Sequence, residues 1–286
     1  MRIPEIYRKG RLPISYEIFP PKGELSMESL RTMAGALVAE KPDYISVTYS
    51  AGGSGNSGRT ALLTGILQKE YNLPAMAHLT CRNSTRADVD EAVRQFQEQG
   101  VKHVLALRGD HVPGCETQDF HFASQLIEYL RETTDMTLGA ACYPEGHVAC
   151  SDPARDLDYL RQKQDLGAEF FITQLFFDND CFFRFREQAA SHGITVPIDA
   201  GVMPILSRES LIKMSFNCGA SIPADVVRLV YKYQDDPESL RAAGIEFAAR
   251  QICQLAEGGV DGIHLYVMNK PDVAHTLTCA LRDAGY

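Results

Sequence analysis

Short apolar runs alternate with helical patterns along almost the whole chain of 286 residues, and this alternation limits the folds open to it. Eight of the runs have the length of β-strands: 14–19, 43–49, 75–80, 101–107, 138–142, 170–175, 198–203 and 263–268. Strand–helix alternation predicts a parallel sheet, and eight repeats predict its closure into a (β/α)8 TIM barrel of the α/β class. We therefore expect residues 1–286 to form a single barrel domain.

Helix signals fill the stretches between these runs. Five helices are expected, most of them with a capping residue in front or a glycine behind: from 26 or 27 to 39, from 84 or 85 to 99, from 151 to 166, from 178 or 179 to 192, and from 238 to 257. About sixty residues with two or three helical patterns separate the last two runs, which exceeds a normal connection. An extra helix near the site is expected there.

Charge and composition narrow the class of partners. The formal net charge of −9 argues against nucleic acid or an anionic membrane surface as a partner. The longest apolar runs fall short of the roughly 20 residues that a membrane span requires. The opening residues 1–5 lack the apolar core of a signal peptide, so the cytoplasm is the expected location.

The eight cysteines are scattered and form no CxxC pair. This distribution does not fit a disulfide scaffold or an iron–sulfur site. Cys142, His147 and Cys150 form the one close group of nitrogen and sulfur ligands, but their spacing differs from that of typical zinc pairs. Buried free thiols are the expected outcome, and no metal site is predicted.

Polar side chains stand at or just after the C-terminal ends of the expected strands, which is where barrel enzymes build their sites. They belong to Glu17, Thr48, Tyr49, His78, Arg108, Asp110, Tyr143, Gln174 and Tyr266, and Gly109 supplies a permissive backbone between Arg108 and Asp110. Glu17 is costly inside an apolar run unless it is paired. It is either part of an ion pair with an arginine or lysine, or an acid whose pKa desolvation raises. A lone His78 is more often a core residue, and Gln174 either binds a flat polar heterocycle or caps a loop.

Two short motifs have competing interpretations. The glycines of 53–58 match GxGxxG, but they follow the strand too late, and no acidic residue ends the next strand, so a loop over the barrel mouth is favoured over a dinucleotide fold. Arg108-Gly109-Asp110 spells an integrin-binding tripeptide, which requires an extracellular loop. At a strand end it indicates either ligand contacts or a simple Arg–Asp surface pair.

Taken together, these segments resemble the methylenetetrahydrofolate reductase family. The matching stretches follow the family's order along almost the whole chain: 15–21, 46–49, 78–81, 106–110, 143–147, 172–177 and 264–270. The resemblance implies a flavin-containing (β/α)8 barrel that reduces 5,10-methylenetetrahydrofolate to 5-methyltetrahydrofolate. It covers the catalytic barrel alone, without the C-terminal regulatory domain of eukaryotic members.

The resemblance also assigns roles to residues. Glu17 matches the family's acid, Asp110 a carboxylate near flavin and pterin, and Gln174 a folate-binding glutamine. The positions matching FAD contacts are Thr48, Tyr49, His78, Arg108, Gly109, Asp110, Tyr143, His147, Asp156, Lys163 and Tyr266. The chain departs from some members at Tyr159 and Gln162, which leaves two possible phosphate or adenine contacts open, and Lys270 replaces a common arginine, keeping its charge but losing the bidentate fork. Whether these departures weaken FAD binding is left open by the sequence.

Three function hypotheses follow. The first is a reductase that takes electrons from NADH or NADPH. The second is a flavin-binding subunit that works only beside an iron–sulfur partner, and the third is a pterin-binding methyltransferase barrel without flavin. A homo-oligomer is compatible with the first two.

Overall fold

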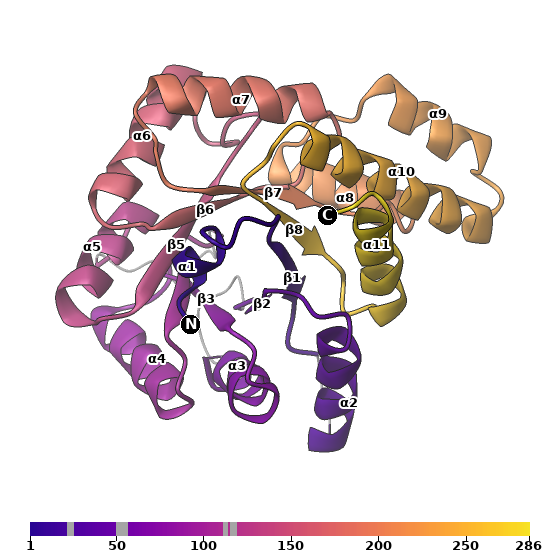
Figure 1. Ribbon diagram of the computed structural model, residues 1–286. Coiled ribbons are helices and arrows are strands. Elements are labelled where there is room, and N and C mark those ends of the chain that lie inside the picture. The colour runs from indigo at the N-terminus through magenta and orange to yellow at the C-terminus, as the bar shows by residue number, and fades with distance from the viewer. Residues whose placement is uncertain (22–25, 50–56, 111–113, 115–118) are drawn as a thin grey trace.

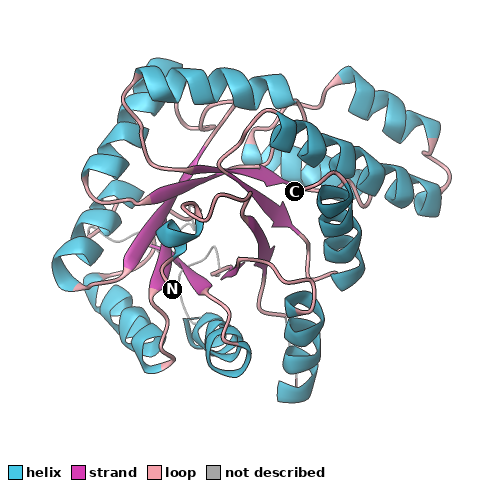
Figure 2. Cartoon of the chain, viewed as in Figure 1, coloured by secondary structure: helices cyan, strands magenta, loops and turns pink. Residues whose placement is uncertain are grey.

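The computed structural model describes residues 1–21, 26–49, 57–110, 114 and 119–286. Its strands close into a barrel in which each pairs in parallel with the next and β8 pairs with β1, so the predicted (β/α)8 fold is confirmed (Figures 1 and 2). The strands are β1 Ile14–Ile18, β2 Tyr44–Val47, β3 Ala75–Thr80, β4 His103–Leu107, β5 Thr137–Cys142, β6 Phe170–Thr173, β7 Ile198–Val202 and β8 Gly262–Tyr266.

Helices surround this ring of strands (Figure 2). They are α1 Ile3–Ile6, α2 Met27–Val38, α3 Ser57–Tyr71, α4 Arg86–Glu98, α5 Ala123–Thr133, α6 Pro153–Asp165, α7 Asn179–Ser191, α8 Arg208–Cys218, α9 Ala224–Lys232, α10 Pro237–Glu257 and α11 Pro271–Asp283. The long connection between β7 and β8 holds α8, α9 and α10, as its helical patterns predicted.

Local chemistry explains where elements begin and end. The Asp152 carboxylate accepts hydrogen bonds from the first amides of α6, with Pro153 in the first turn, and Thr85 caps α4. Several strands are shorter than predicted. After β8, Met268 and Asn269 adopt φ values of 53° and 55°, which a strand cannot accommodate.

The short helix α1 closes the N-terminal end of the barrel, and it lies in front of the strands in Figure 1. Ile3 and Ile6 are buried there against Tyr44, Met76 and Phe170, which come from three different strands. No helix in the described part of the chain is long and apolar enough to cross a membrane.

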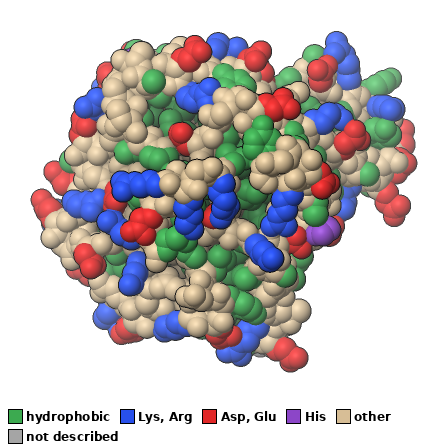
Figure 3. Space-filling model, in the orientation of Figure 1, with side chains coloured by type: hydrophobic (Ala, Val, Ile, Leu, Met, Phe, Trp, Pro, Cys, Tyr) green, Lys and Arg blue, Asp and Glu red, His purple; other side chains and the backbone are tan. Residues whose placement is uncertain are grey.

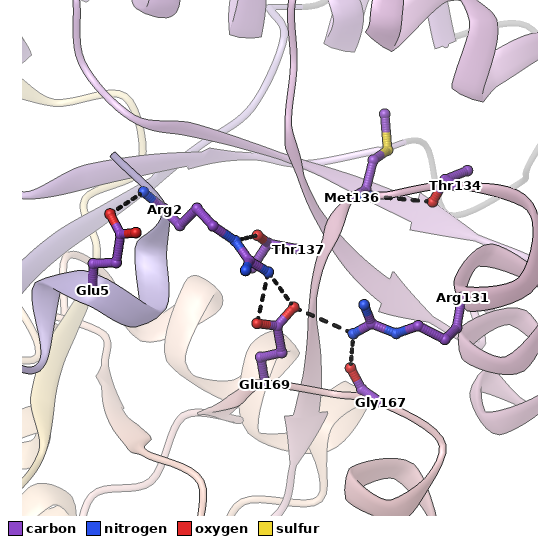
Figure 4. A network of polar contacts seen from close by, with 8 residues as sticks. All are labelled: Arg2, Glu5, Arg131, Thr134, Met136, Thr137, Gly167 and Glu169. Carbon is purple, nitrogen blue, oxygen red and sulfur yellow. Dashed lines mark hydrogen bonds and ion pairs between the residues drawn. The ribbon is translucent and has the colours of Figure 1, made fainter.

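A polar network fastens α1 to the barrel wall. The Arg2 guanidinium donates to both oxygens of Glu169, at 2.8 and 2.9 Å, and to the Thr137 hydroxyl at 3.0 Å. Figure 4 shows Glu169 between Arg2 and Arg131, whose guanidinium donates to it at 3.2 Å. On the face drawn in Figure 3, Lys and Arg side chains gather across the centre, with single acidic side chains among and around them.

Candidate active site

The polar residues predicted at strand ends share one end of the molecule. All C-terminal ends of a closed parallel barrel point the same way, and α1 covers the opposite end. Around the open mouth lie, in strand order, Glu17, Thr48 and Tyr49, His78, Arg108 to Asp110, Tyr143, Gln174 and Tyr266.

Glu17 of β1 lies between His78 of β3 and His264 of β8, the latter on a strand that pairs with β1. Its Oε2 atom is 3.5 Å from His78 Nε2 and 3.7 Å from His264 Nε2, and its side chain is 21% exposed. Within the described residues no arginine or lysine forms an ion pair with it. The expectation of a structural pair with arginine or lysine is therefore wrong, and imidazole rings take that place.

The pKa of Glu17 also differs from the expectation of a raised value. Burial alone raises the pKa of this carboxyl, but contact with His264 and the positive charges of His78 and His264 together bring it below the ordinary 4.5. Burial lowers the pKa of His78 to about 4, so this ring is neutral at pH 7. Glu17 therefore favours its ionised form at pH 7.

A second group of side chains lies beyond β5. The rings of Tyr143 and His147 pack edge to face at 4.6 Å between centroids, and the Lys163 ammonium lies 5.8 Å from the Tyr143 ring. Lys163 also donates to the Ala141 carbonyl at 2.8 Å, and the Asp156 carboxylate accepts the His147 amide at 3.1 Å. These contacts bring together four of the predicted cofactor positions.

The geometry at His147 fits an anionic ligand. His147 Nδ1 accepts the Ala149 amide at 2.9 Å, so a neutral ring carries its proton on Nε2. Nε2 lies 3.4 Å from an Arg108 Nη2 atom, which is also a donor. Arg108 Nε is buried without a partner. An acceptor held by both residues, such as a phosphate oxygen, would satisfy these donors.

Burial disfavours the charged forms of His147 and Lys163. Desolvation and the nearby Arg108 lower the pKa of His147, although Asp156 opposes them. Desolvation likewise lowers the pKa of Lys163. A bound anion would reverse both effects, because it favours the protonated forms.

Gln174 follows β6 and Tyr266 ends β8, so both lie at the mouth. The Tyr266 hydroxyl donates to the Thr173 carbonyl at 2.6 Å, and a Cβ at Gly201 would lie 2.8 Å from that hydroxyl. Glycine at 201 therefore makes room for Tyr266. The Gln174 Oε1 atom accepts the amide of Leu175 at 2.9 Å, so in this state the side chain caps its own loop.

The Arg108–Gly109–Asp110 turn forms no Arg–Asp ion pair within the described residues. Asp110 is exposed, and its carbonyl accepts from Asn83 at 2.8 Å. Gly109 has a φ of 82°, and a Cβ there would lie 2.8 Å from Thr80. The turn thus depends on glycine and leaves both charged side chains available to a ligand.

The remaining residues named in the sequence analysis lie outside the groups of contacts described above. Thr48 accepts the Thr60 hydroxyl through its carbonyl at 2.9 Å, and Tyr49 packs against the main core. Tyr159 is 42% exposed beneath the Arg155 guanidinium, and Gln162 and Lys270 are exposed. The glycine motif of 53–58 lies outside the described residues up to 56, and Gly58 belongs to α3.

The zinc alternative has no support in the described residues. No group of three or more potential ligands gathers there, and burial raises the pKa of the Cys142 thiol, which disfavours the thiolate that zinc needs. The described cysteines are all free.

Sequence reasoning missed His264 as a site residue. It lies two residues before Tyr266 on β8 and therefore points to the same barrel interior. This period of two is the signal that could have found it.

Fold and site together define a (β/α)8 barrel protein whose mouth holds a carboxylate between two histidines and a group of donors suited to an anion. The chain belongs to the methylenetetrahydrofolate reductase family, whose model matches residues 2–281. It is 32% identical to 5,10-methylenetetrahydrofolate reductase of Escherichia coli (strain K12) over 269 residues, covering 94% of this chain and 90% of the relative.

Two further comparisons concern a longer relative and a solved structure of low sequence identity. The chain is 31% identical to Methylenetetrahydrofolate reductase 1 of Schizosaccharomyces pombe over 268 residues, which are 91% of this chain but 44% of that protein. A solved chain of tryptophan synthase from M. tuberculosis matches with a TM-score of 0.55 at 13% identity, covering 97% of this chain and 96% of that one. The latter shows the shared barrel fold alone.

Proposed function

We propose that this protein reduces 5,10-methylenetetrahydrofolate to 5-methyltetrahydrofolate, with FAD as its cofactor and residues 1–286 acting as one catalytic barrel. The observation that carries the proposal is Glu17, because it matches the family's acid and contacts two imidazole rings at the barrel mouth. Such a carboxyl can exchange protons beside a bound substrate.

The residues at the mouth fit FAD. Arg108, His147 and Lys163 would hold its phosphates, since the donors of Arg108 and His147 face each other and Arg108 Nε lacks a partner. The other proposed contacts are Thr48, Tyr49, His78, Gly109, Asp110, Tyr143, Asp156 and Tyr266. When bound and reduced, FAD supplies the hydride for the methylene carbon.

The chain's own residues supply the acid–base and binding steps. Glu17 gives a proton to the folate nitrogen that leaves the methylene carbon, which assists opening of the five-membered ring. Gln174 binds the pterin once its amide oxygen is released from the Leu175 amide. The exposed carboxylate of Asp110 faces cofactor and folate together, where its negative charge disfavours reduced anionic flavin.

Electrons come from NADH or NADPH in this proposal, and the alternative is an iron–sulfur partner. A plant relative is named Probable methylenetetrahydrofolate reductase (NADH), and this chain is 32% identical to it over 284 residues. We also propose a cytoplasmic location, because the described cysteines are free thiols, as a reducing compartment would keep them.

The test is the visible spectrum of the purified protein, followed by anaerobic addition of NADH and NADPH. We expect a flavin spectrum, either as purified or after adding FAD, and bleaching by a nicotinamide. Arg108→Gln should weaken FAD binding at least tenfold, while Arg94→Gln, an exposed residue of α4, should leave it unchanged.

Each hypothesis gives a different result in this test. A protein that binds folate but no FAD is the methyltransferase-like barrel. A flavoprotein that neither nicotinamide reduces, but that an iron–sulfur protein reduces, is the dependent subunit.

A further inference from the structure

A column of polar side chains runs inside the barrel from the closed end to Glu17. It contains Asp199 of β7, Tyr44 of β2, Ser15 of β1 and His264 of β8, and all four are buried. The proposed reaction assigns none of them a role. The opposite part of the interior holds Leu105, Phe170 and Ile172 instead.

Ser15 fixes the orientation of the His264 ring. The Ser15 hydroxyl donates to the Ile263 carbonyl at 3.3 Å, and its oxygen lies 2.7 Å from His264 Nδ1. The oxygen therefore accepts the Nδ1 proton, which makes Nδ1 the protonated nitrogen of a neutral ring.

The other ring nitrogen consequently faces a carboxylate, which can only accept, and a hydroxyl, which can accept or donate. His264 Nε2 lies 3.7 Å from Glu17 Oε2 and 3.5 Å from the Ser46 hydroxyl. A lone pair on Nε2 would repel the carboxylate of Glu17. One proton, carried by either Nε2 or Oε2, removes that repulsion, so the two residues share it.

Groups on every neighbouring strand act on this proton. Glu17, Tyr44, His78, Asp199 and Tyr266 are the titratable ones. The Tyr44 ring stacks on His264 with centroids 6.1 Å apart, and the Tyr44 hydroxyl donates to Asp199 at 2.6 Å. Tyr266 packs edge-on at 5.4 Å, and His78 contacts Glu17 from the other side. The ring therefore lies between the Glu17 carboxyl, which contacts Nε2, and the Tyr44–Asp199 pair, which stacks on its face.

We propose that His264 is a positioning residue that stores the proton for Glu17 and returns it during the reaction, with Ser15 fixing its tautomer. This inference rests on the proposed function. The shared proton passes from His264 Nε2 to Glu17 Oε2 and from there to the folate nitrogen, which leaves Glu17 ionised. His264 is left neutral with its Nδ1 proton on Ser15. One solvent proton restores the pair when the products leave the mouth.

Glu17 needs a nearby proton donor because bound ligands would cut it off from water. The Glu17 side chain is 21% exposed in the empty mouth, whereas His264 is fully buried. A folate and a flavin over the mouth would separate Glu17 from solvent, so His264 becomes the donor within reach.

The first experiment measures single-turnover folate reduction by prereduced holoenzyme from pH 5 to 9. His264→Gln should stay within about twofold of the wild type at pH 5 and fall by about tenfold per pH unit at higher pH, as an unassisted carboxyl does. A loss by one constant factor at every pH would overturn the proposal, because it signals a structural role. His103→Gln, another buried strand histidine, is the control.

The second experiment follows the histidine ring nitrogens by ¹⁵N NMR, so it does not depend on activity. His264 should keep its Nδ1 proton throughout, and Nε2 should take up its proton at a lower pH in Glu17→Gln than in the wild type. An unchanged Nε2 titration in Glu17→Gln rejects the shared proton. If His264→Gln does not fold, Ser15→Ala takes its place and should lose the fixed tautomer.

The outcomes also separate this inference from the proposed function. A wild-type protein that binds FAD and reduces folate, but whose His264→Gln variant keeps the wild-type pH profile, refutes only the proton store. A wild-type protein without flavin or folate reduction refutes the function.

Discussion

Two carboxyl groups lie inside the barrel, Asp199 toward the closed end and Glu17 at the mouth, and their surroundings shift their pKa values in opposite directions. Asp199 accepts the hydroxyls of Tyr7 at 2.9 Å and Tyr44 at 2.6 Å, yet burial raises its pKa to about 6. Burial acts on Glu17 as well, but two histidines bring its pKa below the ordinary value.

The difference shows what each kind of partner can do. The hydroxyl groups of Tyr44 and Tyr7 bring no charge to Asp199, and together with the attraction of His264 they offset its desolvation only in part. Imidazole rings can become cations, and a cation a few ångströms away offsets it fully. The closed end therefore keeps an acid that is reluctant to ionise, and the mouth keeps one that ionises readily.

The largest expected effect tests the role of Glu17 as the acid at the barrel mouth. Glu17→Gln should leave reduction of the flavin intact and slow folate reduction by roughly a hundredfold or more, the usual scale of general acid catalysis. Rapid mixing separates the two half-reactions. Glu132→Gln, an exposed carboxylate of α5, is the control. Equal damage to both half-reactions, together with a lowered melting temperature, would make Glu17 a structural residue.

The next effect is on the pH dependence of the unfolding free energy. Its sign should be opposite for Asp199 at the closed end and for Glu17 at the mouth. Asp199 ionises in the unfolded chain near 3.8 but in the folded protein near 6, so its contribution is full below pH 3.8 and is lost as the pH rises through 6. Relative to Asp199→Asn, the wild type should lose about 3 kcal/mol of unfolding free energy over this range, at about 1.4 kcal/mol per pKa unit.

Glu17 should show the reverse slope in the same measurement. Its folded pKa lies below 4.5, so its contribution is present above that pH and is lost as the pH falls through the folded value. Urea unfolding of the wild type, Asp199→Asn and Glu17→Gln between pH 3.5 and 7 checks both slopes. Slopes of the same sign would contradict the comparison.

A smaller effect tests the packing around Asp199. Gly262 lies opposite Asp199 in the β7–β8 register, and a Cβ there would clash with the carboxyl oxygen Oδ1. Gly262→Ala should cost about 1–3 kcal/mol of stability. The cost should fall in an Asp199→Ala background, because the clashing carboxyl is gone. Gly58→Ala in α3, where a Cβ has room, is the control.

The smallest effect concerns the network that holds α1 over the closed end. Arg2→Ala removes an ion pair with Glu169 whose arginine is 52% exposed, so the loss should stay below about 1 kcal/mol and shrink in high salt. Arg228→Ala, in an isolated surface pair of α9, should change nothing measurable. A loss of several kcal/mol would mean that α1 detaches from the barrel without Arg2.

The sequence was informative wherever the signal is local. Strand–helix alternation predicted the barrel, and the position of Glu17, His78 and Arg108 along their strands predicted the end that they share. The direction of the Glu17 shift was not predictable, because it depends on His264, which comes from the far end of the chain. Pairings such as Ser15 with His264 and Asp199 with Gly262 exist only once the barrel has closed.

The position of α1 has a practical consequence for handling the protein. Met1 is 60% exposed and leads into the helix that covers the closed end, on the side of the barrel away from the mouth. A protein anchored to a sensor chip through Met1 would turn its mouth toward the bulk solution. Cofactor and substrate association could then be followed on the immobilised protein without obstruction by the attachment.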